Sequence, residues 1–452
     1  MSIRVHNTQS GRIETLTPIH PGEVRIYVCG PTVYDELHIG NFRCFVIFDT
    51  LARFLRQSGY EVTKVQNFTD VDDRIIAKAK AEKISLRQVA DRYIDLYHRD
   101  ASRLGIDEQI EPRATDHVPQ MVAHIERLIE LGHAYVADGS VYFSVQSFPA
   151  YGQLSHQPVD ERQAGARVEV EAGKRAPEDF ALWKSEGDPE FSWPSPWGWG
   201  RPGWHIECSV MSADHLGVPF DIHGGGVDLL FPHHENEIAQ STPLVEQSPA
   251  RIWMHNGMLT MSGEKMSKSL KNTFRVSDLL DRYPPEAIRL FLLSAHYRSP
   301  LAAELEGLDQ AKAALRRIEN VLRRLRPMAA PSEAKEGWDR FLGCLADDFN
   351  TAEAQGVLFE TVRQANTALD TGAKPGALGR YLAGIEAMCA LLGVTPKSAD
   401  ENADDGVAEL VLARETARAS RDFALADRLR QQLKDLGVVV EDTAQGSRWH
   451  RA

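Results

Sequence analysis

The sequence predicts an α/β protein built on a parallel sheet, followed by a region that is nearly all helical. Apolar residues alternate at Val24, Ile26 and Val28, and again within residues 61–70, as expected for two strands. A helical pattern of apolar residues three and four apart follows each strand, and such alternation of strand and helix is typical of a parallel sheet. From about residue 306 the pattern stays helical with few interruptions.

The composition is that of a soluble globular protein. The chain has 452 residues with 43% apolar and 25% charged side chains, which suits about two to four domains. Lys and Arg number 51 against 64 Asp and Glu, so the net charge is −13 and any contact with RNA requires local basic patches. Neither a run of eighteen apolar residues nor the apolar core of a signal peptide is present, so we expect a cytoplasmic protein with no membrane contact.

The five cysteines do not resemble a disulfide framework, because their number is odd and they are spread over a long chain. Reduced thiols fit this pattern better, with one or two of them serving as metal ligands. The five are Cys29, Cys44, Cys208, Cys344 and Cys389.

The first strand leads into a loop and then a helix. Pro31 ends the strand pattern after Cys29 and Gly30, and the stretch HIGN at 38–41 precedes a helical pattern that stops at Gly59. A helix N-terminus binds phosphate readily. His38 adds a donor there, and Gly40 has no side chain to hold a nucleotide ring away from the backbone. Taken alone, the stretch favours a loop histidine that caps a core helix.

A second charged stretch lies about two hundred residues downstream, in the glycine-led loop SGEKMSKSL. Lys265 and Lys268 stand three residues apart in it. Two such lysines suit the negative charge that develops on a triphosphate as pyrophosphate leaves.

HIGN and KMSKS resemble the paired ATP-binding signature of class I aminoacyl-tRNA synthetases. The surrounding segments are similar to the cysteinyl-tRNA synthetase family in particular, over nearly the whole chain. Those segments are VCGPTVYD, NFTDVDDRII, GRPGWHIECS, FDIHGGGVDLLFPHHENEIAQ, WMHNGMLT, GEKMSKSL and IRLFLLSAHYRSPL. Phe42, Cys44 and Lys271 depart from the more usual Ala, Thr and Gly, and their roles stay open.

The resemblance implies a Rossmann-like catalytic domain that is split by a connective insertion and followed by an all-α anticodon-binding region. The expected divisions, in chain order, are the first half of the catalytic domain with HIGN (1–115), the connective insertion (116–196), the second half (197–260), the KMSKS loop and stem-contact region (261–305), a helical bundle (306–398) and a C-terminal anticodon-binding domain (399–452).

The stretch FDIHGGG, residues 220–226, reads as a strand that runs into a glycine-rich turn. Consecutive glycines let the backbone approach a ribose or an adenine closely, although three glycines alone are a weak signal. Further along, Arg316, Arg317, Arg323, Arg324 and Arg326 gather on one helical stretch. A solvated helix face is the more usual explanation for each arginine, and contact with an RNA backbone is the alternative for the cluster.

A metal site is suggested by PHHENEIAQ, where His233 and Glu237 stand four apart and would share one helix face. His234 and Glu235 would point elsewhere and could orient the ligands. Spacing alone does not predict zinc, because Cys29 and Cys208 are too distant in sequence. The resemblance implies that Cys29, Cys208, His233 and Glu237 hold one zinc ion per chain.

Four protein ligands are typical of a closed structural zinc site, whereas a catalytic zinc keeps one position open. The resemblance implies that the substrate sulfur joins as a fifth ligand, with the carboxylate the donor most able to yield. Because cysteine and serine have similar shapes, selection by a soft thiolate–zinc bond separates them better than fit does. Cys29 as a nucleophile is the rival interpretation, but no His and Asp arrangement points to it.

The implied reaction has two steps. The cysteine carboxylate attacks the α-phosphorus of ATP, giving cysteinyl adenylate and pyrophosphate, and the cysteinyl group then passes to the 3′ end of cysteine tRNA. His38, Lys265 and Lys268 are the expected catalytic residues, and Mg²⁺ is expected with ATP. A monomer is expected. The implied ATP contacts are His38, Gly40, Asn41, Gly224, Gly225 and Lys268, and the implied cysteine contacts are Tyr27, Gly30, Thr69, Trp204, His223 and Asp228.

Two alternatives are an enzyme of similar fold and chemistry, and a protein of a different functional class. A ligase that joins cysteine to an amino sugar would not need the helical region after residue 306. A noncatalytic RNA-binding relative would not need intact KMSKS or four candidate ligands. A persulfide-forming side activity on Lys78 and Lys80 is also conceivable by resemblance, but a lysine-rich helix face is more often solvated surface.

Overall fold

The computed structural model describes residues 1–452 except 157–172, 262–263, 266–273, 397–398, 421, 444–445 and 452. The chain forms two compact units, Met1–Val394 and Thr395–Ala452. In the described part of the chain, no helix combines the length and apolar character needed to cross a membrane.

A four-stranded parallel sheet lies at the centre of the first unit. Its order is β10–β9–β3–β4, with bounds β3 Glu23–Val28, β4 Glu61–Gln66, β9 Phe220–Gly226 and β10 Ala250–Asn256. In the register, Tyr27 of β3 lies between Val65 and His223, and His223 pairs with Trp253. All four carboxyl ends meet at one edge, which is where open α/β sheets bind ligands. The predicted parallel sheet is confirmed.

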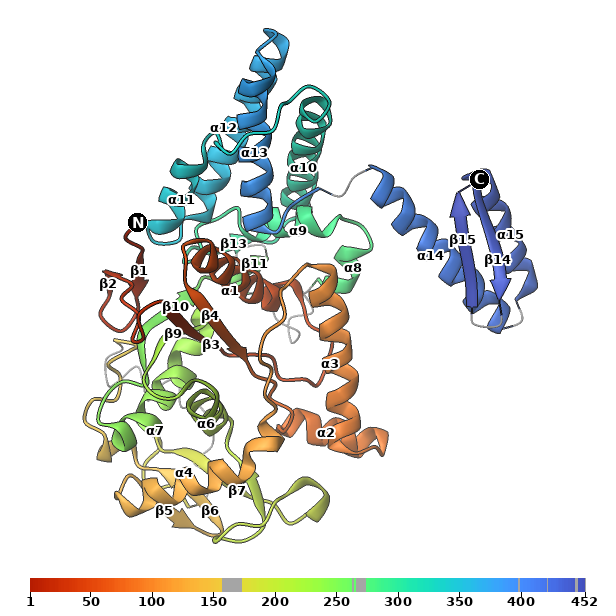
Figure 1. The fold of residues 1–452 in the computed structure, drawn as a ribbon. Coiled ribbons are helices and arrows are strands. Elements are labelled where there is room, and N and C mark those ends of the chain that lie inside the picture. Colours follow the sequence, from red (N-terminus) through yellow and green to blue (C-terminus); the bar gives the residue numbers. More distant parts are fainter. Residues whose placement is uncertain are drawn as a thin grey trace. The chain divides into compact units, whose positions relative to one another are not determined.

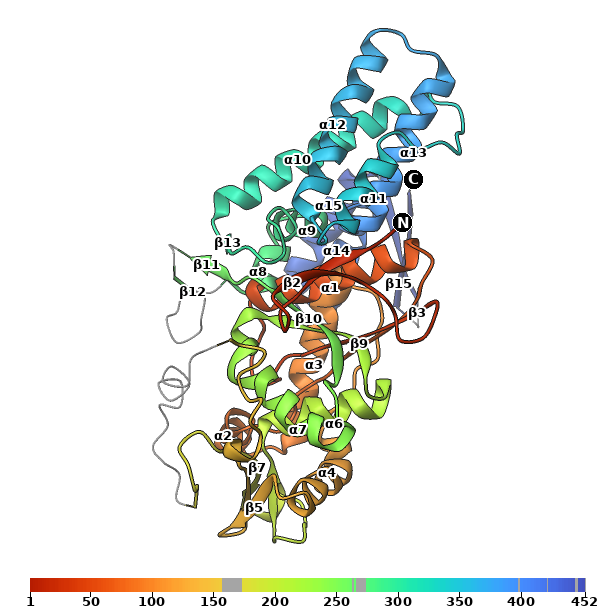
Figure 2. The ribbon, with the colours of Figure 1, turned by 90° about the vertical axis from the view of Figure 1, so that its left-hand side faces the viewer.

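Helices cover both faces of this sheet. Helix α1 (Ile39–Gln57) lies on one face and α6 (Trp204–Leu216) on the other, as Figure 1 and Figure 2 show. Most of α1 is buried because it packs against the sheet and also against α9 (Pro285–Leu292) and α13 (Pro375–Leu392). Gly59, with φ +95°, follows the end of α1, in agreement with the sequence pattern.

An antiparallel sheet of order β5–β6–β7–β8 follows helices α2, α3 and α4. It continues past residue 196, through β8. The bounds are α2 Asp73–Glu82, α3 Leu86–Arg103, α4 Val118–Glu130, β5 Ala134–Ala137, β6 Ser140–Phe143, β7 Phe180–Ser185 and β8 Gly200–Pro202. In Figure 1 this sheet lies at the end of the unit opposite to α10–α13.

The predicted turn at FDIHGGG was wrong, because β9 runs extended through all three glycines. Gly224, Gly225 and Gly226 pair with Met254, His255 and Asn256 of β10. A Cβ on Gly224 would lie 2.3 Å from the Phe48 ring, and one on Gly225 would lie 2.7 Å from the His234 ring. The glycines therefore make room for packing side chains on a strand.

The remaining elements of the first unit are α7 Glu235–Val245, β11 Leu259–Met261, β12 Glu264–Lys265, α8 Val276–Leu280, β13 Leu301–Ala302, α10 Leu305–Leu325, α11 Trp338–Ala346 and α12 Thr351–Asp370, together with the short hairpin of β1 Arg4–Asn7 and β2 Arg12–Thr15.

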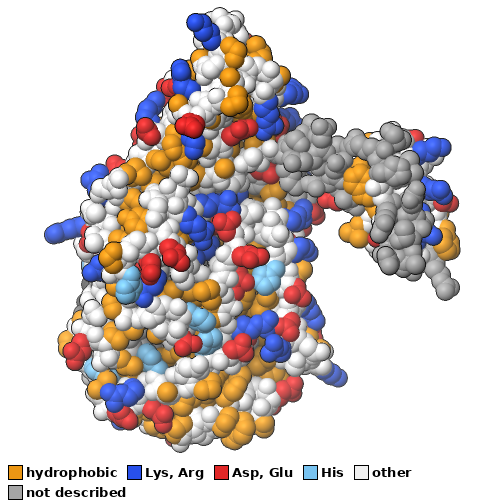
Figure 3. Space-filling model, in the orientation of Figure 1, with side chains coloured by type: hydrophobic (Ala, Val, Ile, Leu, Met, Phe, Trp, Pro, Cys, Tyr) orange, Lys and Arg blue, Asp and Glu red, His pale blue; other side chains and the backbone are white. Residues whose placement is uncertain are grey.

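Helices α10–α13 pack together, as the helical pattern predicted. Arg324 pairs with Asp370, and Arg326 with Glu386, so these two arginines bind neighbouring helices. On the face shown in Figure 3, basic side chains lie among acidic ones.

The second unit contains α14 (Ala399–Ala419), α15 (Phe423–Asp435) and a hairpin. Strands β14 (Val438–Thr443) and β15 (Gly446–Arg451) pair antiparallel, so the mainly helical C-terminal region ends in a two-stranded hairpin. Val438 is buried and Val440 packs beside it, so one face of the hairpin is apolar. A small separate core joins the elements, formed by Val407, Val411, Leu433 and Val438.

Candidate active site

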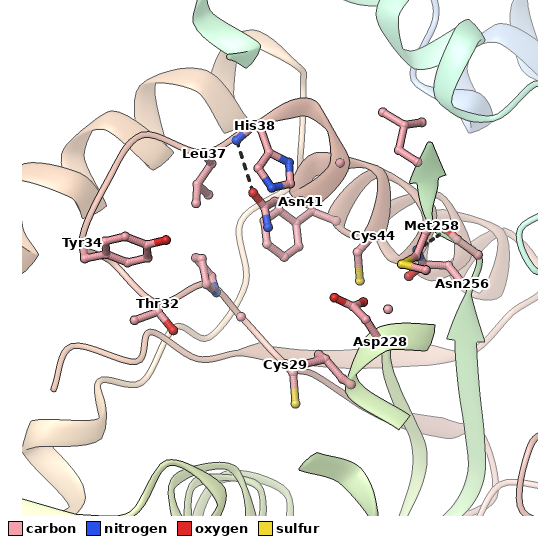
Figure 4. Close-up of a pocket in the computed structure, with 18 of the residues that line it drawn as sticks. Cys29, Thr32, Tyr34, Leu37, His38, Asn41, Cys44, Asp228, Asn256 and Met258 are labelled. Carbon is pink, nitrogen blue, oxygen red and sulfur yellow. Dashed lines mark hydrogen bonds between the residues drawn. The ribbon is translucent and has the colours of Figure 1, made fainter. Parts of the chain in front are cut away.

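A pocket of about 520 Å³ lies at the carboxyl edge of the parallel sheet. Figure 4 shows His38 and Asn41 at the start of α1 on one side, and Cys29, just past β3, on the other. Seven of the predicted site residues line it: Cys29, Gly30, His38, Gly40, Asn41, Trp204 and Asp228. The lining also includes residues that the sequence did not single out as ligand contacts, among them Arg74, Cys44 and Asn256.

The HIGN turn is held by its own side chains. The His38 backbone N–H donates to Asn41 Oδ1 at 3.2 Å, which places Asn41 at the start of α1 as a capping group. A Cβ on Gly40 would lie 2.9 Å from His38 Nδ1, so Gly40 leaves room for the imidazole. The sequence expected Gly40 to clear space for a nucleotide, and in the structure it first clears space for His38.

Both flanks of the KMSKS stretch are fastened to α1. On the downstream side, the Ile39 N–H donates to Phe274 O at 3.0 Å, and His38 pairs with Arg275 in a short antiparallel bridge. On the upstream side, the buried Arg43 guanidinium donates to the carbonyls of Gly257 at 2.7 Å and Met258 at 3.0 Å. The described flanks of the KMSKS stretch therefore contact the helix that begins with HIGN, although more than two hundred residues separate them from it along the chain.

Arg43 also donates to Ser299 O at 2.7 Å, so one guanidinium joins α1 to two loop segments. Burial lowers the pKa of Arg43 to about 10, and carbonyl oxygens rather than a carboxylate balance the charge. Lys268 and its motif lie outside the described residues. Lys265 ends β12, and its side chain is outside them as well.

Cys29 lines the pocket and belongs to a buried group with Cys208, His233 and Glu237, which we call the pocket floor. Their ligand atoms are all within 4.8 Å of one another, and all four residues are buried. Cys29 Sγ is 3.6 Å from Cys208 Sγ and 3.5 Å from Glu237 Oε1, and His233 Nε2 is 3.2 Å from the same oxygen. This group could hold a metal ion.

The electrostatics of this floor favour a cation. Burial, followed by the contact with Cys208, raises the pKa of Cys29 well above its usual value. The pKa of Cys208 is also raised: the contact with Cys29 lowers it, but burial and Glu237 outweigh that effect. Burial holds the pKa of His233 well below its usual value, so the imidazole is neutral and can serve as a metal ligand. A bound metal ion would stabilise the thiolates that burial alone disfavours.

The prediction that His234 points elsewhere was wrong. Its Nε2 lies 3.3 Å from Cys29 Sγ, and its Nδ1 lies 2.8 Å from His255 Nε2. The cause is local, since His233 and His234 fall in an irregular π-helical turn, Leu230–His234, before α7 begins. Glu235 does point away, and its carboxylate accepts the backbone N–H groups of Gly152 and Ser155.

A second group of donors, Cys29, His223, His234 and Glu237, also lies within 4.8 Å. The two groups share Cys29 and Glu237. His223 Nε2 contacts Glu237 Oε2 at 2.8 Å, while His233 contacts Oε1. His223 is therefore positioned to orient the carboxylate from behind.

The remaining predicted cysteine contacts surround this floor. Trp204 stacks on His233, with ring centroids 4.2 Å apart. It lines the pocket, and 39% of its surface is exposed. The buried Tyr27 ring packs against the His223 ring, with ring centroids 5.3 Å apart. Thr69 lies beyond the end of β4 and donates through Oγ1 to Glu207 Oε2 at 2.7 Å.

Gly30 is required by backbone packing, because a Cβ there would lie 1.7 Å from Asn67 O. The Gly30 N–H donates to Asn67 Oδ1 at 2.9 Å. Asn67 and Glu207 are buried site residues that the sequence analysis missed. Their positions carried a signal, since Asn67 follows a strand in the stretch NFTD and Glu207 directly precedes Cys208.

Three family models match the chain in order. A catalytic-domain model described as tRNA synthetases class I (C) matches residues 15–313. A DALR domain matches residues 340–395, and a cysteinyl-tRNA ligase anticodon binding domain matches residues 400–449.

Full-length relatives agree with these models. The cysteine--tRNA ligase of Alkalilimnicola ehrlichii is 50% identical over 463 residues, covering 99% of this chain and 100% of that protein. The enzyme of the same name from Halorhodospira halophila is 49% identical over 459 residues, covering 99% of each. The chain belongs to the cysteine--tRNA ligase family. The family resemblance predicted from HIGN and KMSKS is confirmed.

Solved structures related to this cysteine--tRNA ligase family member are more distant. Mycobacterium tuberculosis methionyl-tRNA synthetase bound by methionyl-adenylate has a TM-score of 0.59 at 16% identity, covering 82% of this chain and 90% of that chain. The Agrobacterium radiobacter K84 agnB2 LeuRS in its ternary complex has a TM-score of 0.60 at 13% identity, covering 85% and 88%. This likeness concerns the fold alone, and it confirms the α/β class.

Proposed function

We propose that the chain ligates L-cysteine to the 3′ end of cysteine tRNA through a cysteinyl adenylate. One observation carries the proposal: Cys29 lines the same pocket as the HIGN turn, and it belongs to the buried group that Cys208, His233 and Glu237 complete. A donor set suited to sulfur and a turn suited to phosphate thus border one cavity, the donor set through Cys29 and through Trp204, which stacks on His233. Relatives of the same length carry the name of this activity.

The floor residues fit zinc. Two thiols, an imidazole and a carboxylate are donors that zinc takes in proteins, and three of their mutual distances, 3.2, 3.5 and 3.6 Å, suit a common ion. The group with both cysteines is the better candidate, because two thiolates favour a soft metal. When bound, zinc would supply a site for the substrate thiolate. His223 would hold Oε2 of Glu237. Oε1 would then be the ligand most easily displaced by the substrate sulfur.

The nucleotide half of the site depends on α1. We place His38 beside the phosphates, with Gly40 and Asn41 shaping the turn that receives them. Lys268, and with it Lys265, would stabilise the leaving pyrophosphate, and Mg²⁺ would accompany ATP. Their supporting observation is the attachment of both flanks of the KMSKS stretch to α1. The role predicted for Gly224 and Gly225 has less support, since Phe48 and His234 occupy the space above them.

Catalysis in this scheme is positioning and charge stabilisation. The cysteine carboxylate attacks the α-phosphorus of ATP, and the bond to pyrophosphate breaks without a protein nucleophile. Trp204, Thr69 and Asp228 would border the amino acid. Transfer to tRNA follows, and the anticodon binding domain match at 400–449 favours a tRNA substrate over an amino sugar.

Exchange of labelled pyrophosphate into ATP tests the proposal. We expect exchange that depends on cysteine, and exchange with serine slower by at least about 1,000-fold, because a buried site built for one polar group rejects its analogue strongly. Zinc content is measured on the same protein. A smaller difference between the two amino acids would contradict selection by a metal ion, and absence of exchange with cysteine would contradict the proposed reaction.

Lys268→Ala tests the nucleotide half separately. We expect cysteine-dependent exchange to slow by about 100- to 1,000-fold, the usual cost of losing one charge-stabilising donor, while the Kd for cysteine changes less than about twofold. Lys271→Ala is the matched control in the same stretch. A parallel loss of cysteine binding would point to a folding defect instead.

A further inference from the structure

A second cluster of metal-binding side chains lies outside the pocket, where the turn Ala114–His117 meets the last turn of α6. His117, Asp214 and His215 each offer one ligand atom, and these atoms lie within 4.8 Å of one another. His117 is buried, whereas Asp214 and His215 are exposed to solvent. No step of the proposed reaction uses these three residues.

The distances suit a shared ion. His117 Nε2 is 3.1 Å from His215 Nε2 and 3.3 Å from Asp214 Oδ2. Ligands bound tetrahedrally to zinc at 2.0–2.1 Å lie about 3.3 Å from each other, so the observed separations need little adjustment. A pair of hydrogen-bonded imidazoles also explains the first distance, but not the convergence of the carboxylate on the same nitrogen.

His117 is already oriented as a ligand. Its Nδ1–H is placed to donate to Arg113 O at 2.8 Å, which leaves the lone pair on Nε2 directed at the other two residues. A backbone carbonyl behind the imidazole is a usual support for a metal-bound histidine. His117 therefore presents a preset donor that needs no rearrangement to bind.

The surroundings also favour a cation. Asp214 and His215 lie in the last turn of α6, where the helix dipole stabilises positive charge.

We propose that His117, Asp214 and His215 form a second metal site that takes a divalent cation of the zinc type, completed by water. Two imidazoles and one carboxylate select such borderline ions over Mg²⁺ and Ca²⁺, which require more oxygen ligands. The proposal does not depend on the proposed function, because none of its ligands belongs to the pocket.

Binding would cross-link two parts of the catalytic unit. His117 directly precedes α4, while α6 carries both Trp204 and Cys208. An ion that binds only the folded chain stabilises it by an amount that grows with the ratio of the free ion concentration to its Kd. The site would therefore fasten α6 to the segment that leads into α4.

Metal stoichiometry tests the proposal on the full-length chain. After dialysis against micromolar Zn²⁺, we expect two zinc ions per chain in the unaltered protein, one in His215→Gln and one in Cys208→Ser. Cobalt distinguishes the two sites, since only the site with cysteines produces thiolate-to-cobalt charge-transfer absorption. His215→Gln should keep that absorption and lose one cobalt ion.

His98→Gln is the matched control, because His98 is another exposed histidine beside a carboxylate, Glu111. It should retain both ions. Asp214→Asn should weaken the second site by about 10-fold or more without altering the first. In the Cys208→Ser background, zinc should raise the melting temperature by a few degrees, and His215→Gln should abolish that shift. One ion in the unaltered protein, or two in His215→Gln, would overturn the proposal.

Discussion

Two clusters of buried polar side chains lie within Met1–Val394, and they differ in whether the protein alone balances their charges. The first is the pocket floor of Cys29, Cys208, His233 and Glu237. The second surrounds Asp49 of α1, where Arg289 of α9 donates to Asp49 Oδ2 at 2.7 Å. Asp49 and Arg289 are both fully buried.

The Asp49 cluster is complete. Arg53 also donates to Asp49 Oδ2 at 2.9 Å, and the Asp107 N–H donates to Oδ1 at 2.9 Å. Arg289 also donates to backbone carbonyls, including Leu392 O at 2.9 Å, and to Thr50 Oγ1 at 3.1 Å. Burial opposes the charge on Asp49, but Arg289 and other cations outweigh it and hold the pKa of Asp49 below its usual value.

The pocket floor is incomplete. Among the described residues, the charged partners of Glu237 are the histidines His223, His233 and His234, whose charge depends on protonation. His223 Nδ1 and the nearby Glu207 Oε1 have no hydrogen-bond partner among the described residues. Buried polar atoms normally find partners, so a cluster that leaves them open is typical of a ligand site. Charge balance thus separates a structural cluster from a functional one.

The largest expected loss of stability comes from breaking the Asp49 cluster. Arg289→Met should lower the free energy of unfolding by about 3–5 kcal/mol, because it leaves the Asp49 carboxylate buried without its main partner. Urea denaturation measures this change. Arg53→Met, at a partly exposed position beside the same carboxylate, should cost less. Asp49→Asn combined with Arg289→Met should recover part of the loss, and additive costs would contradict the coupling.

Cys208→Ser changes the pocket floor. We expect it to lower the free energy of unfolding less than Arg289→Met does, and to weaken ligand binding strongly. We expect the pocket to lose metal affinity by at least about 100-fold, the upper range seen when even an orienting partner is removed, with cysteine affinity falling in parallel. Metal analysis and calorimetric titration with cysteine measure the two effects. Cys389→Ser controls for the loss of a buried thiol elsewhere. Unchanged zinc at the pocket would refute the ligand assignment.

The smallest expected effect is a loss of stability at acidic pH, caused by the buried His255. Burial, followed by His223 and His6, lowers the pKa of His255 to about 3, against an ordinary value of 6.5. The folded chain keeps His255 neutral while the unfolded chain takes up a proton, so stability is present above pH 6.5 and is lost as the pH falls below it. Between pH 7.5 and 5.5 this group accounts for about 1.4 kcal/mol of lost stability.

His255→Gln should remove that share of the acid sensitivity. Urea denaturation at the two pH values, with a chelator present throughout, compares the variant with the unaltered protein. Arg53→Met should leave the pH dependence in this range unchanged. The same loss of stability in His255→Gln would show that His255 is already charged in the folded chain.

Much of the catalytic unit could be predicted from periodicity. Residues 24–28 and 61–66 are strands, and the helical pattern after Asn41 ends before Gly59, because short-range apolar spacing decides which face is buried. The strand at residues 220–226 was harder. Its glycines are typical of a turn, and only the rings of Phe48 and His234 packed above them explain an extended strand.

The sequence by itself determined the class of fold and the family, because these depend on residue types in a fixed order, and its resemblance to the family named the four residues that the structure brings together as a candidate metal site. Only the tertiary structure decided what those residues meet. His234 turns toward Cys29, Arg43 joins α1 to the flank of the KMSKS stretch, and His117 comes to face His215. Such contacts join residues that are distant along the chain, and their geometry depends on how helices and strands pack rather than on local pattern.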